Sequence, residues 1–188
     1  MPRPDRSRAA LIETAGTLFR RQGYAATGLN QILEDAGVKA GSLYHHFPGG
    51  KQELAAAVVE SAGRQIEQVL RAALARDVDV ADVIDQWVDL LSAGLAADCR
   101  DGCPVEPIAT ESVHASELVR NAAAGAFDSW CVAMTERLQA DGANPKRAKE
   151  IALAVVSIIE GALMLSRTSG DTAALNAAKT AARAVVGR

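Results

Sequence analysis

The chain has 188 residues, of which 49% are hydrophobic and 23% are charged, and its formal net charge is −3. This apolar fraction can bury a sizeable core, which excludes a wholly disordered protein. The charge is unevenly distributed, because residues 1–51 carry seven basic and four acidic side chains and the rest carries 13 basic and 19 acidic ones. A basic first quarter indicates a small module that faces an anion.

Helical patterns run along the whole chain, and alternating strand patterns are nearly absent. Ala occupies 38 of the 188 positions, and Ala is the best helix former. In the first helix, apolar residues recur at spacings of three and four until Gly23, which is a stop signal. A short helix is then expected between Thr27 and Gly37, and another over residues 39–47. Two short helices joined by a Gly-containing turn, after a longer helix, predict a helix-turn-helix unit.

The remainder of the chain predicts further helices, so we expect an all-α fold of about nine helices. Their expected ranges are about 52–76, 77–99, 105–111, 117–140, 146–167 and 172–186. We expect a helix-turn-helix domain over residues 1–51 and a second helical domain over residues 52–188.

Several features bear on the compartment in which the chain works. No uninterrupted apolar run exceeds six residues, whereas a bilayer span requires roughly 20. The first residues are charged and lack the apolar core of an export signal. Three cysteines, an odd number without a recognisable framework, fit a reducing compartment. We therefore expect a cytoplasmic protein with no membrane partner.

Residues 23–54 read GYAATGLNQILEDAGVKAGSLYHHFPGGKQEL and carry four linked motifs. These are G-[YF]-x-x-T, then I-x-x-x-A-G-V, then G-[ST]-[LI]-Y-x-[HY]-F, and finally K-x-x-L. In these residues the chain resembles the TetR family of transcriptional regulators. The extra glycine in HFPGGK, together with GCPVEPIATE and EGALMLSR further on, resembles the LmrA/YxaF-like branch of that family.

The resemblance implies double-stranded DNA as a partner, read by the second short helix. The first residues of this helix have short side chains, which suits a helix that approaches base edges. Tyr44, His45 and His46 would supply hydrogen-bond donors to the phosphates. Lys51 would add a charge beside the N-terminus of the next helix, which is a favourable phosphate site. The predicted DNA contacts are Thr27, Lys39, Ala40, Gly41, Ser42, Tyr44, His45, His46 and Lys51.

Two positions depart from the family pattern. Gly28 stands where Ser or Thr is usual, and Lys39 stands where Ser or Thr often caps the reading helix. We expect Lys39 to donate to DNA instead of capping, and Thr27 to cap the preceding helix and touch phosphate. A flexible basic arm would supplement these contacts through Arg3, Arg6 and Arg8.

The predicted helix at residues 146–167 is apolar on most of its circumference, so it must be covered on two sides. Its own domain covers one side, and a second subunit is the economical explanation for the other. TetR relatives pair their last two long helices in a four-helix dimer interface, which implies a homodimer. A large monomeric core is the alternative. The predicted interface residues are Ile151, Val155, Ile158, Ile159, Leu175, Ala178, Ala182 and Val185.

The few aromatic residues of the second domain gather in two predicted helices. Trp130 and Met134 are four positions apart and share a face, so they would wall a cavity with Trp87 and Leu91 opposite. The family resemblance implies a small-molecule effector, although the same side chains would equally form ordinary core. The predicted effector contacts are Trp87, Leu91, Phe127, Trp130 and Met134.

Other chemistry has little support in the sequence. Cys99 and Cys103 have one distant histidine, His114, and lack the second ligand pair of a zinc site, so we expect no metal and no cofactor. Motifs of nucleophilic, metal-dependent or phosphate-binding enzymes are missing, so we do not expect an enzyme.

We therefore expect a ligand-responsive transcriptional regulator. The expected form is a homodimeric repressor that binds a palindromic operator and is released by a small, mostly apolar or aromatic effector. One alternative is a helical small-molecule-binding or enzyme-like module whose N-terminal unit does not read DNA. Another is an activator, which the sequence does not separate from a repressor.

Overall fold

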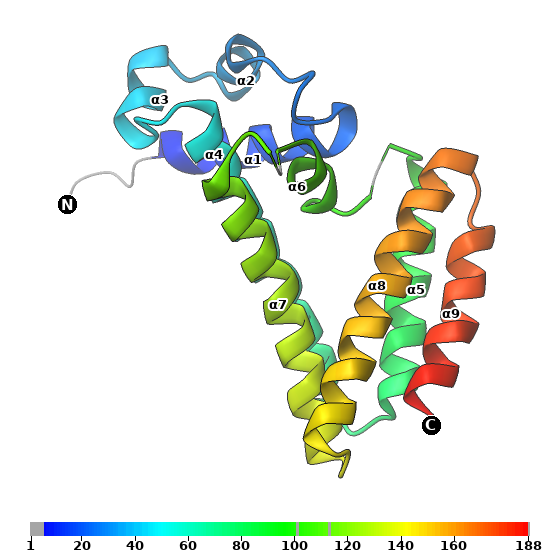
Figure 1. Ribbon diagram of the computed structural model, residues 1–188. Coiled ribbons are helices and arrows are strands. Elements are labelled where there is room, and N and C mark those ends of the chain that lie inside the picture. Colours follow the sequence, from blue (N-terminus) through cyan, green and yellow to red (C-terminus); the bar gives the residue numbers. More distant parts are fainter. Residues whose placement is uncertain (1–5, 101, 113, 188) are drawn as a thin grey trace. The chain divides into compact units, whose positions relative to one another are not determined.

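The computed structural model describes residues 6–100, 102–112 and 114–187, and all regular elements in these ranges are α-helices (Figure 1). The helices are α1 (Arg6–Gln22), α2 (Leu29–Ala36), α3 (Ala40–His46), α4 (Lys51–Leu74), α5 (Val80–Ala97), α6 (Glu106–Ser112), α7 (Glu117–Ala140), α8 (Pro145–Ser169) and α9 (Ala173–Val186). The prediction of an all-α fold with about nine helices is confirmed. Among the described residues, no helix combines the length and apolar character needed to cross a membrane.

Helix ends follow signals that are local in the sequence. Gly37 ends α2 with a φ of 63°, a left-handed conformation that glycine adopts without steric cost. Asp79 precedes α5 and accepts a hydrogen bond from Ala81 N at 2.7 Å. Asn144 precedes α8 and accepts one from Lys146 N at 3.0 Å. Each of these side chains satisfies a backbone N–H that the first helical turn leaves without an intrahelical partner.

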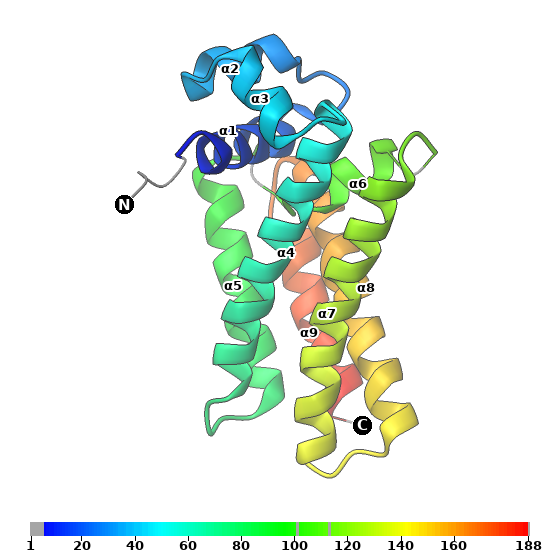
Figure 2. The same cartoon turned by 90° about the vertical axis from the view of Figure 1, so that its left-hand side faces the viewer.

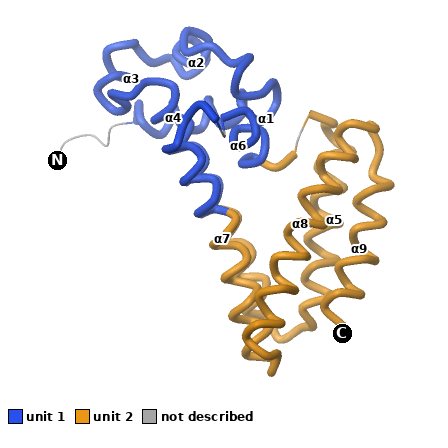
Figure 3. The backbone as a smooth tube through the Cα atoms, viewed as in Figure 1, with its two compact units in different colours: residues 1–64, 104–126 blue, residues 65–103, 127–188 orange. Residues whose placement is uncertain are grey.

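The chain divides into two compact units (Figure 3). One unit comprises residues 1–64 and 104–126, and the other comprises residues 65–103 and 127–188. Helices α4 and α7 therefore contribute to both units. The predicted domain boundary after residue 51 does not coincide with this division, because the first half of α4 packs with the helix-turn-helix and α6 joins it there.

In the first unit, α1 packs against both α2 and α3 (Figure 2). The halves of α4 and α7 in this unit also approach closely, since a Cβ atom on Gly63 would lie only 2.6 Å from the Cβ of Ala126. The absence of a side chain at Gly63 is what permits this approach. The largest fully buried side chains of the unit are Leu11, Phe19, Ile32, Leu43, Phe47, Leu54, Val59, Val105 and Ile108.

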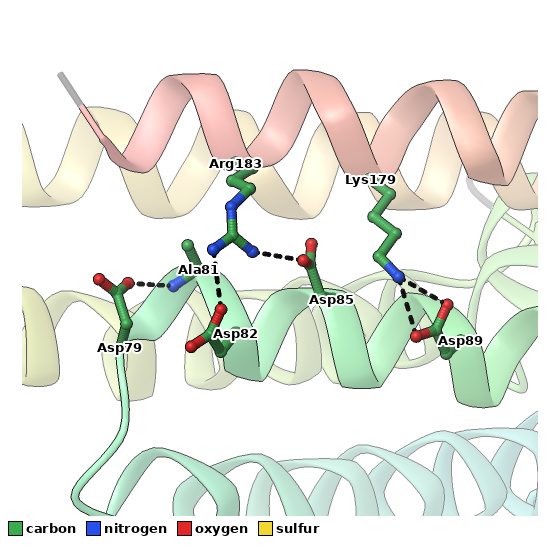
Figure 4. Close-up of polar contacts among 7 residues, drawn as sticks. All are labelled: Asp79, Ala81, Asp82, Asp85, Asp89, Lys179 and Arg183. Carbon is green, nitrogen blue, oxygen red and sulfur yellow. Dashed lines mark hydrogen bonds and ion pairs between the residues drawn. The ribbon is translucent and has the colours of Figure 1, made fainter.

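In the second unit, α9 packs along α8 and α5. A row of ion pairs also joins α5 to α9 (Figure 4): Arg183 pairs with Asp82 at 2.8 Å and with Asp85, and Lys179 pairs with Asp89 at 2.9 Å. These carboxylates raise the pKa of Lys179 and of Arg183, chiefly through hydrogen bonds. We call these five residues the α5–α9 ion-pair row. Because its members are largely solvated, each pair contributes little to stability.

Arg137 of α7 holds the connection between α4 and α5. Its guanidinium donates to the carbonyl oxygens of Leu74, of Arg76 at 3.0 Å and of Val78 at 2.7 Å, and it pairs with Asp141. The carbonyls at the end of α4 thereby gain the partners that a helix C-terminus lacks.

Candidate functional site

Helix α3 has one buried side and one exposed polar side. Leu43 is fully buried, and Phe47, the residue directly after the helix, is nearly so. These two residues are four positions apart and anchor α3 in the first unit. Tyr44 is 54% exposed, although burial of its large aromatic ring would be favourable. We call the exposed side of this segment the reading face, and it comprises Lys39, Ala40, Gly41, Tyr44 and His45, with Ser42 and His46 half-buried at its edge.

Lys39 occupies the N-cap position of α3, with extended backbone at φ −76° and ψ 148°. A lysine side chain has no acceptor atom, so it cannot satisfy the backbone N–H groups of the first turn. Lys39 is exposed, and its ammonium is therefore available to an external anion. The expectation that Lys39 does not cap the helix is confirmed, and its contact with DNA stays a prediction.

Thr27 does not cap α2, and this part of the prediction is wrong. The N-cap is Gly28, one residue later. The Thr27 hydroxyl instead donates to the carbonyl of Gly23 at 2.7 Å and accepts from Gln22 Nε2 at 3.2 Å. The side chain is only 1% exposed. Because the hydroxyl is engaged with the end of α1 and buried, we leave Thr27 out of the DNA contacts that we propose.

Lys51 makes contacts inside the first unit that the sequence did not indicate. Its ammonium donates to the carbonyl of Tyr24 at 2.6 Å and lies 4.2 Å from the centroid of the Tyr24 ring. Burial lowers the pKa of Lys51, and the neighbouring Glu111 carboxylate opposes that shift. Burial also raises the pKa of Tyr24. Lys51 thus holds the turn between α1 and α2, and its contact with phosphate stays a prediction.

The expectation of a flexible arm is wrong for two of its three arginines. Arg6 and Arg8 belong to the first turn of α1. The Arg8 guanidinium lies 5.4 Å from the centroid of the Phe47 ring, a cation–π contact that ties α1 to the end of α3. Arg3 lies outside the described residues.

The five residues predicted to bind an effector all belong to the second unit. Trp130 and Met134 are buried, which agrees with their common face on α7. The rings of Phe127 and Trp130 meet edge to face, with centroids 5.1 Å apart. Trp87 and Leu91 on α5 are half-buried. A separate hollow of about 830 Å³ in this unit has a mostly polar lining that includes Asp77, Arg137, Asp141 and Arg147 and none of these five residues.

Most of the predicted dimer contacts, which lie on α8 and α9, are buried inside their own subunit. Six of the eight, Ile151, Val155, Ile159, Leu175, Ala178 and Ala182, are buried, and Ile158 and Val185 are half-buried. A side chain that already packs in its own core offers no surface to a partner. The apolar residues that α8 exposes are Leu153, Met164 and Leu165. Leu153 and Met164 lie off the three-and-four spacing of the buried set, whereas Leu165 follows Ala162 by three positions and lies on it. The offset of Leu153 and Met164 was the available signal.

Cys131 does not have the environment of an activated thiol. Burial, reinforced by Asp128, raises the pKa of Cys131, which disfavours the reactive thiolate. Cys99 is exposed and Cys103 is buried. Within the described ranges, no group of three or more His, Cys, Asp or Glu side chains is arranged to hold a metal ion.

A helix-turn-helix unit whose third helix is anchored by two apolar residues and exposes a polar face defines a DNA-binding protein. A family model described as "Bacterial regulatory proteins, tetR family" matches residues 11–58. A second model, "Transcriptional regulator LmrA/YxaF-like, C-terminal domain", matches residues 79–181. The chain belongs to the TetR family of transcriptional regulators, in its LmrA/YxaF-like branch.

Individual relatives agree with this assignment. The chain is 36% identical over 170 residues to the HTH-type transcriptional regulator LmrA of Bacillus subtilis, covering 90% of each chain. It is 34% identical over 166 residues to the uncharacterized HTH-type transcriptional regulator YxaF of the same organism, covering 88% of this chain and 87% of the relative. A TetR transcriptional regulator from Legionella pneumophila has the same fold, with a TM-score of 0.83 over 97% of both chains at 21% identity. The chain is therefore a transcriptional regulator and not an enzyme.

The internal role of Thr27 gives a testable prediction. Thr27→Val keeps the shape of the side chain but leaves the Gly23 carbonyl without the hydroxyl and removes one of two hydrogen bonds of the Gln22 amide, so we expect a loss of about 1–2 kcal/mol in the free energy of unfolding. Thr27→Ser keeps the hydroxyl and serves as the matched control, which should lose less. Urea unfolding of the three proteins measures both effects. Equal stability of the Val variant and the parent would show that the hydroxyl is not used inside the unit.

Proposed function

We propose that this chain is a homodimeric repressor that binds a palindromic operator through the reading face of α3 and is released by a small, mostly apolar or aromatic effector. The DNA-binding part of this proposal rests on the reading face. Its polar side chains are exposed while Leu43 and Phe47 fix the helix from the other side. Such an arrangement presents a rigid polar surface to a groove.

Gly41 supports an external partner for this face. A Cβ atom at Gly41 would have no heavy atom of the described residues within 4 Å, so packing inside the protein does not require a glycine there. Glycine inside a helix is less favourable than alanine by about 1 kcal/mol. An external partner would explain the glycine, because it allows the backbone of α3 to approach the base edges closely. Ser42, the next residue, can both donate hydrogen bonds to bases and accept them.

Two copies of the reading face would explain a palindromic operator. A seven-residue helix contacts only a few base pairs, and helix-turn-helix dimers read two half-sites roughly 34–36 Å apart. Leu153 and Met164 are eleven positions apart on α8 and therefore share one side of it, and their exposed side chains supply an apolar surface that a second copy would cover. We therefore assign the dimer contact to this side of α8, in place of the buried residues that the sequence pattern suggested.

The effector would act by a shift of populations. Release follows if the effector binds more tightly to the conformation whose two reading faces do not match the operator. Phe127 and Trp130 are in ring contact, with Met134 one turn further along α7, and these are aromatic and apolar side chains of the kind that line small-molecule sites. Trp87 and Leu91 on α5 are half-buried and complete the set that we propose.

The tests described below also distinguish two other functions. A module that binds small molecules without reading DNA would show neither a footprint nor salt-dependent affinity for its upstream DNA. An activator would bind DNA in the same way but raise transcription from that promoter in vitro.

DNA binding is tested by the dependence of operator affinity on salt. For the parent protein, the logarithm of the binding constant should fall linearly with the logarithm of salt concentration. Lys39→Ala should weaken binding and reduce the slope by about 1 for each subunit, because one phosphate contact per subunit is lost. Tyr44→Phe should weaken binding at least about tenfold by removing a hydrogen bond to a charged phosphate. Fluorescence anisotropy with labelled upstream DNA gives these values.

The matched control for charge is Lys149→Ala, which removes an exposed lysine of α8 in the second unit. It should leave both the affinity and the slope unchanged. A parent protein whose binding constant does not depend on salt would exclude this mode of DNA recognition.

The dimer contact is tested by introducing a charge on the exposed side of α8. Leu153 is 62% exposed, and Leu153→Glu would place like charges in an apolar interface, so we expect dissociation at micromolar concentration. Leu90→Glu is the control, because Leu90 is 61% exposed on α5. Sedimentation velocity should give a dimer for the parent and for Leu90→Glu and a monomer for Leu153→Glu. A dimeric Leu153→Glu protein would place the interface elsewhere.

The effector site is tested with the two tryptophans, which both lie in the proposed set. Trp87→Phe and Trp130→Phe each leave one fluorophore. Planar aromatic compounds that release the operator in an anisotropy assay should also quench the remaining tryptophan, with free N-acetyltryptophanamide as the control for absorption by the compound. Compounds that release DNA without changing either fluorophore would indicate a site away from these residues.

A further inference from the structure

The turn between α1 and α2, residues 23–28, is held by polar contacts from several parts of the first unit. Thr27 ties it to the end of α1, and Lys51 of α4 binds the carbonyl of Tyr24. A further contact comes from α6, where the Glu111 carboxylate accepts a hydrogen bond from Ala25 N at 2.5 Å. This contact joins residues 86 positions apart. A backbone N–H that donates to a carboxylate makes a charge-assisted hydrogen bond, which is stronger than a neutral one.

Lys51 and Glu111 act on the same peptide group. The carbonyl of Tyr24 and the N–H of Ala25 belong to one peptide bond, so a cation binds the oxygen of that group and an anion binds its hydrogen. Rotation of this peptide plane by half a turn would direct the carbonyl oxygen at the carboxylate and the N–H at the ammonium. Both contacts would then be repulsive, and the two charges therefore select one orientation of the peptide.

Gly23 shows that the carboxylate sits tightly against the turn. Its φ is +90°, a conformation that residues with a side chain rarely adopt. A Cβ atom at Gly23 would also lie 2.6 Å from Glu111 Oε1, which is closer than real contacts of this kind. The backbone conformation thus favours glycine, and a side chain at this position would displace the carboxylate of Glu111. Glu111 is the last residue of the GCPVEPIATE segment, whose resemblance to the family branch gave no role for it.

We propose that Glu111 is a positioning residue for DNA reading: with Lys51 it fixes the Tyr24–Ala25 peptide and thereby the start of α2 and the orientation of the reading face. This inference rests on the proposed DNA-binding function. The turn leads directly into α2, and α2 leads through a three-residue turn into α3. A change in the turn therefore changes where α3 presents its exposed residues, although Glu111 itself touches no base or phosphate.

The test compares Glu111→Ala and Glu111→Gln with the parent. In Glu111→Ala, the Ala25 amide should exchange with solvent at least about tenfold faster in NMR hydrogen-exchange measurements, and operator affinity should fall about tenfold, which corresponds to one charge-assisted hydrogen bond. The slope of affinity against salt should not change, because no phosphate contact is lost. Glu111→Gln keeps an acceptor oxygen and should recover part of both losses.

Glu60→Ala is the matched control, because Glu60 is an exposed carboxylate of the same unit that pairs with Arg64 one turn away at 3.7 Å. It changes the net charge by the same amount and should leave Ala25 exchange and operator affinity as they are in the parent. If Glu111→Ala behaves like this control, the positioning role is wrong while operator binding stands. If the parent itself does not bind the operator, the proposed function and the positioning role both fail.

A pair of substitutions separates this role from a general loss of stability. Gly23→Ala should weaken operator binding several-fold more in the parent than in the E111A background, because the added Cβ displaces the Glu111 carboxylate only where that carboxylate is present. Equal losses in the two backgrounds would show that Glu111 and Gly23 act independently, which contradicts the proposal. Urea unfolding of each variant establishes that the compared proteins are folded.

Discussion

The Tyr24–Ala25 peptide group is the constraint on which the DNA-binding unit depends. Lys51 from α4 binds its carbonyl and Glu111 from α6 binds its N–H, so two segments distant in sequence converge on one peptide plane. The short helices α2 and α3 have eight and seven residues, and helices of this length are unstable in isolation. Their positions must therefore come from tertiary contacts. The buried side chains of Leu43 and Phe47 provide the apolar part, and the fixed turn provides the polar part.

The polar residues of the helix-turn-helix divide between two tasks. Thr27 and Lys51 are directed inward and hold the turn, and Arg8 lies over the Phe47 ring. Lys39, Tyr44 and His45 are exposed on the reading face. The basic excess of the first 51 residues thus overstates the charge that can meet phosphate, because part of it serves the internal packing. Affinity for DNA would depend correspondingly more on neutral donors and on the accuracy with which α3 is held.

The helices and the family could be predicted from the sequence because their signals are local. Gly37 ends α2 and Asp79 caps α5 as expected, and the motif over residues 23–54 has fixed spacing. Side-chain directions could not be predicted in the same way. Periodicity showed that Ile151 and Val155 share a side of α8, but it does not say whether that side meets the same chain or another one. The contact of Glu111 with Ala25 depends on chain topology, which no local pattern contains.

The α5–α9 ion-pair row has a consequence for the alignment of these two helices. They run in opposite directions, since Arg183 meets Asp82 and Asp85 while Lys179 meets Asp89. If α9 slid by one turn in one direction, Lys179 would face uncharged residues beyond Asp89. A slide in the other direction would leave Asp89 without its cation. The weak pairs of the row add little stability, but together they favour one register of α9 along α5 over its neighbours. The small side chains of the Ala-rich α9 would distinguish these registers poorly on their own.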